Sequence, residues 1–314
     1  MENGSELNIV FGTGPLGYAV TEELLNKGKT VRMVNRSGEA DLPNGAMLIR
    51  ADAEDRERTR EVCKDAKAVY HCAMPPYTQW KELFPPLTTG IMEGAASANA
   101  KLIYADNLYM YGYTDSPLSE SSPNNPLGTK GIVRAEMSNN LLAAYKEGKV
   151  KVAIGRASDF YGPRVLASIL GERVFNPALA GKTIRMLGNI DVPHSYIYIK
   201  DFAKGLVILG EESSTSGEVW HIPAAEALTT RELLHFIFNE TKKTPRVQTT
   251  SPFIVNLLSM FNPIIKELRE VMPTYEKTYL VDHSKFEKSF GNPSIPHKEA
   301  LTETVKWYKK NYRK

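Results

Sequence analysis

The sequence predicts an α/β fold with a doubly wound parallel sheet, joined to a smaller, mainly helical C-terminal lobe. Short β-branched runs alternate with amphipathic helical stretches through the first half of the 314-residue chain. A glycine-rich turn, "GTGPLG", follows the first of these runs and opens a helix. After Arg156 the alternation loosens, and beyond about Thr229 helical patterns dominate. The alternation indicates parallel strands, because each helix returns the chain to the edge where the previous strand began.

The strands expected in the sheet are short and rich in β-branched residues, and they cover residues 7–12, 30–35, 46–52, 68–73, 101–106 and 150–156. The helices expected between them cover residues 15–28, 54–65, 80–99 and 130–147. The later elements alternate less regularly, with helices over 165–181, 199–211, 229–241, 252–272 and 298–312 and strands over 183–188 and 217–224.

Composition and charge narrow the classes of function. Apolar residues make up 42% of the chain and charged residues 24%, which is ordinary for a globular protein. The formal charge of +3 is small and dispersed, so we expect no nucleic-acid partner. No apolar run reaches the length of a membrane span and no secretory leader is evident, so we expect no membrane association and a cytoplasmic location. The six histidines form no cluster with metal-ligand spacing, and Cys63 and Cys72 are expected to be reduced thiols, so we expect no metal and no disulfide.

The turn "GTGPLG" carries the first functional signal. Gly12, Gly14 and Gly17 have the G-x-G-x-x-G spacing. Between a strand and a helix, the first glycine permits a tight turn, the second lets the backbone approach a pyrophosphate, and the third allows the helix to pack closely on the strand. The helix N-terminus adds unpaired N–H groups and the positive end of its dipole. The sequence therefore predicts a dinucleotide site whose phosphate-binding residues are Gly12, Thr13, Gly14, Pro15, Leu16 and Gly17.

The end of the second strand bears on the choice of nucleotide. An acidic residue there would bind the ribose 2′-hydroxyl of NAD, whereas this chain has Asn35 followed by Arg36. An arginine can pair with the 2′-phosphate of NADP, so we expect NADP(H) to be preferred over NAD(H); a solvated surface arginine is the alternative. Asp52 and Ala53 follow the third strand, where the carboxylate can accept a hydrogen bond from the adenine amino group. Capping of the next helix by Asp52 is an equally open role.

Together with five further segments, these features resemble the NAD(P)-dependent epimerase/dehydratase family, the extended short-chain dehydrogenases/reductases. The segments are "AVYHCA" (68–73), "YADNLYMYG" (104–112), "GRASDFYGPR" (155–164), "HSYIYIKDFAKGLV" (194–207) and "GEVWHIP" (217–223). The resemblance runs over essentially the whole chain and implies a Rossmann-like cofactor domain that also contacts the cofactor through Cys72, Ala73, Met74 and Ala157. It implies a dinucleotide-binding domain at 1–163 plus about 185–225, and a substrate lobe at about 164–184 plus 226–314.

The helix after the fifth strand departs from the family pattern. In the family, a tyrosine and a lysine one helical turn later precede an Ala-Glu pair, and both face the nicotinamide. Counting back from Ala135 and Glu136 places Gly128 and Ile132 at those two positions. Lys130 lies two residues away, on roughly the opposite helix face, and is not a simple substitute. The sequence thus keeps the helix and lacks the usual Tyr–Lys pair.

Other residues are therefore candidates for the proton transfer. Tyr77 lies just past the fourth strand and Tyr109 follows the fifth, at the edge where such sheets bind ligands; each could instead pack the cleft wall. Asn107 occupies the family's serine or threonine position and can hydrogen-bond a carbonyl. Asp159 and His194 fall in segments that resemble the substrate lobe. His194 stands near the place where related sequences have a phosphate-binding arginine, which makes a nucleotide-sugar substrate less favoured.

These observations predict an atypical NAD(P)-dependent oxidoreductase, or an epimerase/dehydratase-like protein, with a non-standard active site. It would act on a small, carbonyl-bearing substrate through Tyr77, Asn107 or Tyr109. The alternative is a non-catalytic NADP(H)-binding redox sensor or regulatory protein. Helices of this fold class can form a homodimer interface, but no residue pattern identifies one in this chain.

Overall fold

The computed structural model describes residues 6–250, 260 and 271–311. Contacts within the chain divide it into two units. Unit 1 comprises Met1–Asn107, Ile132–Arg156 and Ala203–Ile222, and unit 2 comprises Leu108–Gly131, Ala157–Phe202 and Pro223–Lys314. The boundaries expected from the sequence separate a cofactor domain from a substrate lobe, whereas these two units are defined by contacts alone. The expected boundaries therefore stay a prediction. Among the described helices, none combines the length and the apolarity that crossing a membrane requires.

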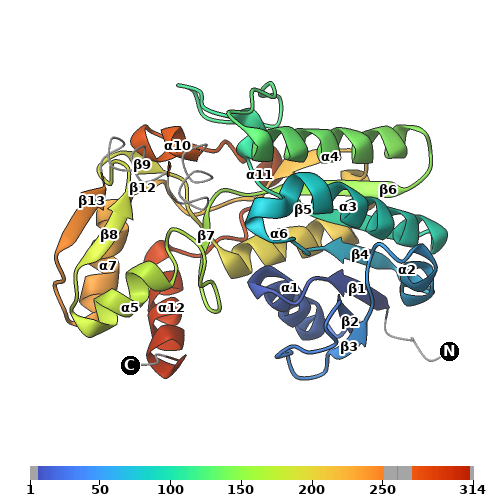
Figure 1. The fold of residues 1–314 in the computed structure, drawn as a ribbon, viewed down its shortest axis with the longest axis horizontal. Coiled ribbons are helices and arrows are strands. Elements are labelled where there is room, and N and C mark those ends of the chain that lie inside the picture. Colours follow the sequence, from blue (N-terminus) through green and yellow to red (C-terminus); the bar gives the residue numbers. More distant parts are fainter. Residues whose placement is uncertain (1–5, 251–259, 261–270, 312–314) are drawn as a thin grey trace. The chain divides into compact units, whose positions relative to one another are not determined.

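Unit 1 is built on a seven-stranded sheet in the order β11-β6-β5-β4-β1-β2-β3, in which every neighbouring pair is parallel (Figure 1). Its strands are β1 (Leu7–Phe11), β2 (Thr30–Asn35), β3 (Met47–Arg50), β4 (Ala68–His71), β5 (Lys101–Asp106), β6 (Lys151–Arg156) and β11 (Val219–His221). Its helices are α1 (Pro15–Asn26), α2 (Arg56–Cys63), α3 (Trp80–Ser97), most of α4 (Thr129–Lys146) and most of α6 (Ile199–Glu211), with the short 3₁₀ helices η1 (Tyr77–Gln79) and η3 (Ser213–Thr215).

Two sets of helices cover the two faces of this sheet. On one face α2 packs beside α3, and Thr88 of α3 donates a hydrogen bond to Met137 Sδ of α4 at 3.8 Å. On the other face Lys27, just after α1, pairs with Glu211 at the end of α6 at 2.7 Å. Helices on both faces allow the strands to be buried on both sides, which is what their continuous apolar runs predict. The doubly wound sheet predicted from the sequence is confirmed.

The predicted elements agree with the observed ones except in the later part of the chain. Each of the strands in the sheet of unit 1 falls inside a predicted range. The helix expected over 165–181 is wrong in its first part, because α5 begins only at Glu172. The chain reverses there so tightly that a Cβ on Gly171 would overlap Leu166 O, and this reversal excludes a continuous helix. The helix expected over 252–272 lies almost entirely outside the described residues.

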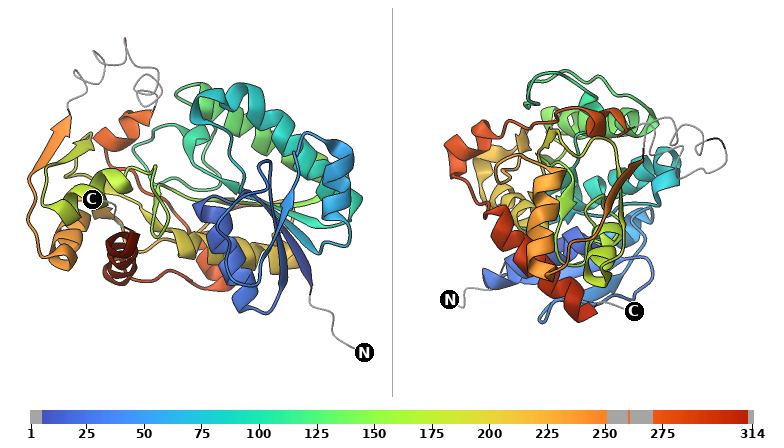
Figure 2. Two further views of the ribbon diagram at one scale, coloured as in Figure 1. Left: turned by 60° about the horizontal axis from the view of Figure 1, so that its bottom comes forward. Right: turned by 90° about the vertical axis from the view of Figure 1, so that its left-hand side faces the viewer.

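Unit 2 is mainly helical and also holds three two-stranded sheets (Figure 2). Its helices are α5 (Glu172–Ala180), α7 (Thr230–Thr241), α10 (Pro273–Glu276), α11 (Ser284–Phe290) and α12 (His297–Asn311), with the 3₁₀ helix η2 (Tyr109–Tyr111). The strand pairs are β7 (Phe160–Tyr161) with β10 (Ile197–Tyr198), β8 (Ile184–Leu187) with β13 (Val247–Thr250), and β9 (Pro193–His194) with β12 (Leu228–Thr229). Of these strands, the sequence predicted only β8. The strands β7, β9, β10 and β12 have two residues each, which is too short for a pattern, and no residue of β13 is buried, so that strand lacks an apolar face.

The turn between β1 and α1 requires glycine at two positions and leaves the third open. Gly12 has a φ of +102°, and a Cβ there would lie 2.6 Å from Ala73 N. A Cβ on Gly17 would overlap Gly12 O, so α1 packs directly on the turn. Gly14 is the N-cap of α1, and an added Cβ would meet no atom within 4 Å. The space beside the Gly14 backbone is therefore open.

Alanine substitutions should show that the packing of the turn needs glycine at position 17 but not at position 14. Gly17→Ala pushes a methyl group onto the Gly12 carbonyl, so we expect Tm to fall by roughly 5 °C or more. Gly14 has a φ of −71°, which alanine adopts readily, so Gly14→Ala should shift Tm by less than about 2 °C. Thermal unfolding followed by circular dichroism measures both shifts. Equal destabilisation by the two variants would contradict this account of the turn.

His71, at the end of β4, is a buried titratable group in the core of unit 1. Only 1% of its surface is exposed, and its Nε2 lies 3.0 Å from Thr88 Oγ1. Its ring packs against Phe84 and Tyr104. Burial, with the neighbouring Arg134 guanidinium as the second cause, lowers the pKa of His71 to about 3. The imidazole is therefore neutral in the folded protein at pH 7.

The depressed pKa of His71 makes folding sensitive to acid. Between its ordinary value of 6.5 and about 3, the unfolded chain binds a proton that the folded chain does not, so this contribution to stability is complete above pH 6.5 and decreases as the pH falls. We expect His71→Gln to flatten the loss of unfolding free energy between pH 6.5 and about 4.5, measured by urea titration. His235→Gln changes an exposed histidine and should leave that slope unaltered. If the unfolding free energy of His71→Gln falls with pH as steeply as that of the wild type, other groups cause the acid sensitivity.

Candidate functional site

The side chain of Asn35 ties the glycine turn to the loop that follows β2. Its Nδ2 donates to Thr13 Oγ1 and to Glu39 O, both at 2.9 Å. Its Oδ1 accepts a hydrogen bond from Gly38 N at 2.7 Å. The Asn35 amide thus acts as a scaffold that fixes Thr13 and the loop, and it thereby positions Arg36, which lies within the loop.

Two arginines stand at the carboxyl ends of β2 and β3. The Arg36 side chain is exposed. Arg50 pairs in register with Asn35, its Nε donates to Arg36 O at 3.1 Å, and its side chain packs against the position where Gly38 would carry a Cβ. Sequence reasoning identified Arg36 but missed Arg50. The signal was available, because neighbouring parallel strands end at the same edge of the sheet.

Asp52 and Ala53 follow β3. Asp52 is exposed, and its Oδ1 accepts a hydrogen bond from Glu54 N at 3.1 Å. The N-cap of α2 is Asp55, whose carboxylate accepts from Arg58 N at 3.0 Å. The alternative role of Asp52 as the cap of α2 is therefore wrong, and its contact with adenine stays a prediction. Ala53 is buried.

The segment after β4 runs beside the glycine turn. Ala73 is the residue against which Gly12 packs, Cys72 is a half-buried free thiol, and Met74 is exposed. Burial of the thiol raises the pKa of Cys72 to about 12, so it is protonated and unreactive at neutral pH. Ala157, which follows β6, is buried in unit 2.

The carboxyl edge of unit 1 fits the phosphate groups of a dinucleotide. The space beside Gly14 is open, and no side chain caps the N–H groups at the start of α1. An anion at this position would gain hydrogen bonds from those groups and favourable interaction with the helix dipole. The exposed guanidinium of Arg36 adds a positive charge at the same edge of the sheet.

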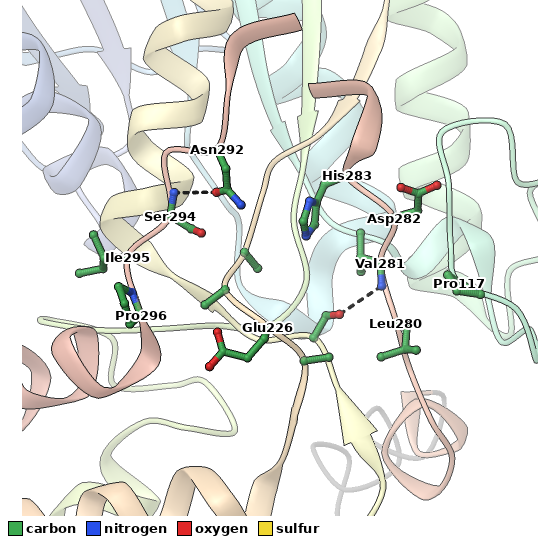
Figure 3. A pocket seen from close by; sticks show the side chains of 14 residues that line it. Pro117, Glu226, Leu280, Val281, Asp282, His283, Asn292, Ser294, Ile295 and Pro296 are labelled. Carbon is green, nitrogen blue, oxygen red and sulfur yellow. Dashed lines mark hydrogen bonds between the residues drawn. The ribbon is translucent and has the colours of Figure 1, made fainter. Parts of the chain in front are cut away.

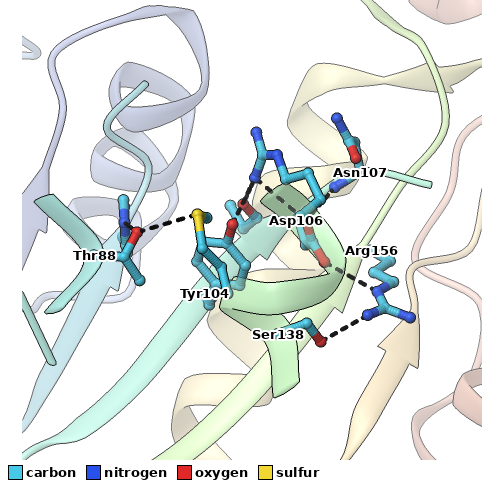
Figure 4. A network of polar contacts seen from close by, with 10 residues as sticks. Thr88, Tyr104, Asp106, Asn107, Ser138 and Arg156 are labelled. Atoms are coloured by element: carbon cyan, nitrogen blue, oxygen red, sulfur yellow. Dashed lines mark hydrogen bonds and ion pairs between the residues drawn. The ribbon is translucent and has the colours of Figure 1, made fainter. Parts of the chain in front are cut away.

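Asp106, at the end of β5, joins two arginines in a buried network (Figure 4). Its Oδ1 lies 3.3 Å from Arg134 Nη1 of α4, and its Oδ2 accepts from Arg156 Nε of β6 at 3.0 Å. Arg156 Nη2 donates to Ser138 Oγ of α4 at 2.7 Å, and Asn107 N donates to Asp106 Oδ1 at 2.9 Å. The network therefore fixes α4 to two adjacent strands of the sheet.

Arg134 also lies among aromatic rings, which hold its guanidinium on α3 and β5. Its Cζ is 4.6 Å from the ring centroid of Trp80, 4.4 Å from that of Phe84 and 5.8 Å from that of Tyr104. Its Nη1 donates to Tyr104 Oη at 2.8 Å. Cation–π contact and ion pairing together compensate for the burial of this charge.

Gly128 and Ile132 are the residues predicted to stand in place of the usual Tyr–Lys pair near the start of α4, and this stays a prediction. Ile132 is 47% exposed, whereas Lys130 is only 3% exposed, so the two side chains lie on different sides of the helix. Lys130 and Gly128 line a cavity of about 20 Å³ in unit 2. The other residues around it are Tyr109, Gly112, Leu127, Gly131, Val271 and Thr274. This cavity brings the candidate Tyr109 together with Gly128 and Lys130.

The other two catalytic candidates lie in unit 1. Tyr77 is half-buried at the start of η1, and its ring packs edge-on against Trp80 with the centroids 5.3 Å apart. Asn107 is half-buried directly after β5, where its backbone bonds Asp106. Neither residue lines the cavity at Gly128.

A second polar cluster lies in unit 2. Asp159 Oδ2 accepts a hydrogen bond from Tyr275 Oη at 2.9 Å and lies 3.2 Å from His194 Nε2. His194 and Tyr275 are buried. Sequence reasoning singled out Asp159 and His194 but missed Tyr275, which is 116 residues away from Asp159 in the chain. No local motif signals that contact.

A cavity of about 700 Å³ is also present in unit 2 (Figure 3). It is lined by Pro117, Ser195, Ala224, Ala225, Glu226, Ala227, Leu280, Val281, Asp282, His283, Asn292, Ser294, Ile295 and Pro296. One of its polar groups is already hydrogen-bonded within the protein, because Ser195 Oγ accepts a hydrogen bond from Val281 N at 3.1 Å. None of the cofactor-binding or catalytic residues expected from the sequence lines it. In the described part of the chain, no three His, Cys, Asp or Glu side chains gather as a metal site would require.

Similar proteins cover nearly the whole chain. The sterol-4-alpha-carboxylate 3-dehydrogenase (decarboxylating) of Mus musculus is 23% identical over 97% of this chain and 91% of its own length. The UDP-N-acetyl-alpha-D-glucosaminuronate decarboxylase of Bacillus cytotoxicus is 22% identical over 96% and 97%, respectively.

Solved structures share the fold. The dTDP-glucose 4,6-dehydratase of Streptomyces venezuelae, solved with NAD bound, superposes with a TM-score of 0.80 at 19% identity, over 97% of each chain. The UDP-glucose 4-epimerase of Thermotoga maritima gives a TM-score of 0.79 at 18% identity, over 98% of this chain and 100% of the other. Residues 9–222 match the model of the NAD dependent epimerase/dehydratase family. The resemblance inferred from the sequence is confirmed, and the chain belongs to the NAD dependent epimerase/dehydratase family of enzymes.

Proposed function

We propose that this chain is an NADP(H)-dependent oxidoreductase with a non-standard active site that acts on a small, carbonyl-bearing substrate. Family membership and the open glycine turn at Gly14 support cofactor binding. Once bound, the nicotinamide would supply the hydride that is exchanged with the substrate carbon. Relatives named as a dehydrogenase, a decarboxylase and dehydratases favour an enzyme over a non-catalytic redox sensor. A homodimer and a cytoplasmic location stay predictions.

The preference for NADP(H) follows from the charges at the carboxyl ends of β2 and β3. Arg36 is exposed there and Arg50 holds its backbone carbonyl, so two guanidinium groups share this edge. No acidic residue ends β2 to bind a ribose 2′-hydroxyl or to repel a 2′-phosphate. The nearby Asn35 amide is committed to the loop. A 2′-phosphate would therefore meet positive charge without an opposing carboxylate from β2.

Replacing Arg36 should weaken the binding of NADPH and leave the binding of NADH nearly unchanged. We expect Arg36→Gln to weaken NADPH binding by about tenfold or more and NADH binding by less than about twofold, because only NADPH carries the 2′-phosphate. Fluorescence titration of each reduced cofactor gives the two Kd values. Arg60→Gln removes an exposed arginine of α2 and is the matched control. Equal losses for both cofactors in Arg36→Gln would contradict the assignment.

We assign the proton transfer to Tyr109, and the cavity at Gly128 is the observation that carries this assignment. Tyr109 and Lys130 both line that cavity, where the family pattern has its tyrosine. An ammonium group beside a phenol stabilises the phenolate that forms when the proton passes to the substrate oxygen. Asn107, after β5, can hydrogen-bond the substrate carbonyl. Tyr77 is the weaker candidate, because its ring packs against Trp80 and does not line the cavity.

Removing the Tyr109 hydroxyl should slow the chemical step without loosening the cofactor. We expect Tyr109→Phe and Lys130→Met each to lower kcat for NADPH oxidation by roughly 100-fold, with the Kd of NADPH unchanged. The assay uses the aldehyde or ketone that the wild type reduces fastest in a panel. Tyr77→Phe is the matched control and should retain wild-type kcat. If Tyr77→Phe lowers kcat and Tyr109→Phe does not, the proton donor is Tyr77 and the assignment to Tyr109 is wrong.

A further inference from the structure

The Asp159 carboxylate is held in a fixed orientation by two side-chain donors. Tyr275 Oη donates to Asp159 Oδ2 at 2.9 Å, and His194 Nε2 lies 3.2 Å from the same oxygen. A carboxylate only accepts hydrogen bonds, so His194 must carry its proton on Nε2 to donate. Burial above all, with the charge of Asp159 next, raises the pKa of Tyr275, so its hydroxyl stays protonated and donates as well.

The ring of His194 is locked by aromatic neighbours. Its centroid lies 4.4 Å from that of Tyr196, 5.2 Å from that of Tyr279 and 5.6 Å from that of Tyr275. Tyr196 is in turn held by a hydrogen bond of 2.8 Å to Thr230. The donor side of the Asp159 cluster is therefore rigid, which is the property of a preorganised binding group.

The other oxygen of Asp159 remains to be satisfied. Both contacts go to Oδ2, and within the described residues Oδ1 has no hydrogen-bond or ion-pair partner. The side chain keeps 22% of its surface exposed. An ionised carboxylate accepts about four hydrogen bonds, so Oδ1 is a rigid acceptor that presents itself to a ligand or to water.

The cluster lies near the proposed proton donor. Thr274, adjacent to Tyr275 in α10, lines the cavity at Gly128 together with Tyr109. Tyr109 is also close enough to contribute to the raised pKa of Tyr275. Both observations concern residues of unit 2. The proposed proton donor and the Asp159 cluster are thus linked through two adjacent residues of α10, Thr274 and Tyr275, so under the proposed function one small substrate would reach both.

We propose that Asp159 Oδ1 accepts a hydrogen bond from a substrate hydroxyl group, and that the substrate carries no phosphate at this position. The inference rests on the proposed function and names its substrate class: a small, hydroxylated, phosphate-free carbonyl compound. A hydroxyl group satisfies Oδ1 without adding charge. A phosphate group would instead meet a carboxylate whose described contacts include no lysine or arginine.

Ligand-observed NMR titration of the NADP⁺-saturated protein tests this inference with dihydroxyacetone and dihydroxyacetone phosphate as probes. We expect the wild type to bind dihydroxyacetone at least about tenfold more tightly than its phosphate. Asp159→Asn keeps the shape and removes the charge, so the ratio should fall below about threefold. Asp191→Asn alters an exposed carboxylate of the same unit, paired with Arg231, and should leave the ratio unchanged.

Three results would overturn the inference: equal or tighter binding of the phosphate by the wild type, a ratio that survives in Asp159→Asn, or no binding of either probe at about 50 mM. If Asp159→Asn fails to fold, the comparison of the two probes on the wild type still decides. Binding is measured without turnover. A protein that binds NADPH but reduces no carbonyl therefore refutes the proposed function separately from the role of Asp159.

Discussion

The buried carboxylate of Asp106 is the constraint on which the packing of α4 against the sheet depends. Arg134 and Arg156 approach its two oxygens from α4 and β6, and Arg156 extends the contact to Ser138. Arg134 and Ser138 are one helical turn apart, so the network holds α4 at two points on one face. Removing one partner of a buried ion pair typically costs about 3–5 kcal/mol, because a charge is left uncompensated. The register of α4 on β5 and β6 is therefore set by charge as well as by apolar packing.

Under the proposed function, the same network gives the end of β5 an orienting role. Asn107 stands at the position where the sequence resemblance implies a serine or threonine, and Asp106 precedes it. Asp106 is engaged by two arginines and by the Asn107 backbone. The Asn107 amide donates hydrogen bonds but does not transfer a proton at neutral pH. This edge of the sheet thus has a structural role, and the proposed function takes its proton donor from another segment.

Sequence reasoning succeeded where the cause of a structure is local. The alternation of apolar runs predicted every strand of the large sheet, and the glycine spacing predicted the open position at Gly14. It failed where the cause is a tertiary contact. The reversal that delays α5 to Glu172 depends on the approach of Leu166 O to Gly171. The bond from Tyr275 to Asp159 joins distant segments, and nothing in either segment encodes the other.

Two glycines near the start of α4, Gly128 and Gly131, line the cavity that Tyr109 and Lys130 also line. Gly128 contributes no side chain to the cavity beside α4, which a tyrosine at that position would fill. A Cβ on Gly131 would lie 2.5 Å from Tyr109 O, so any larger residue there would push η2 away from the helix. Gly131 therefore allows η2 to approach the start of α4. That approach places Tyr109 and Lys130 around one cavity, so under the proposed function Gly131 is the residue that makes room for the proton donor.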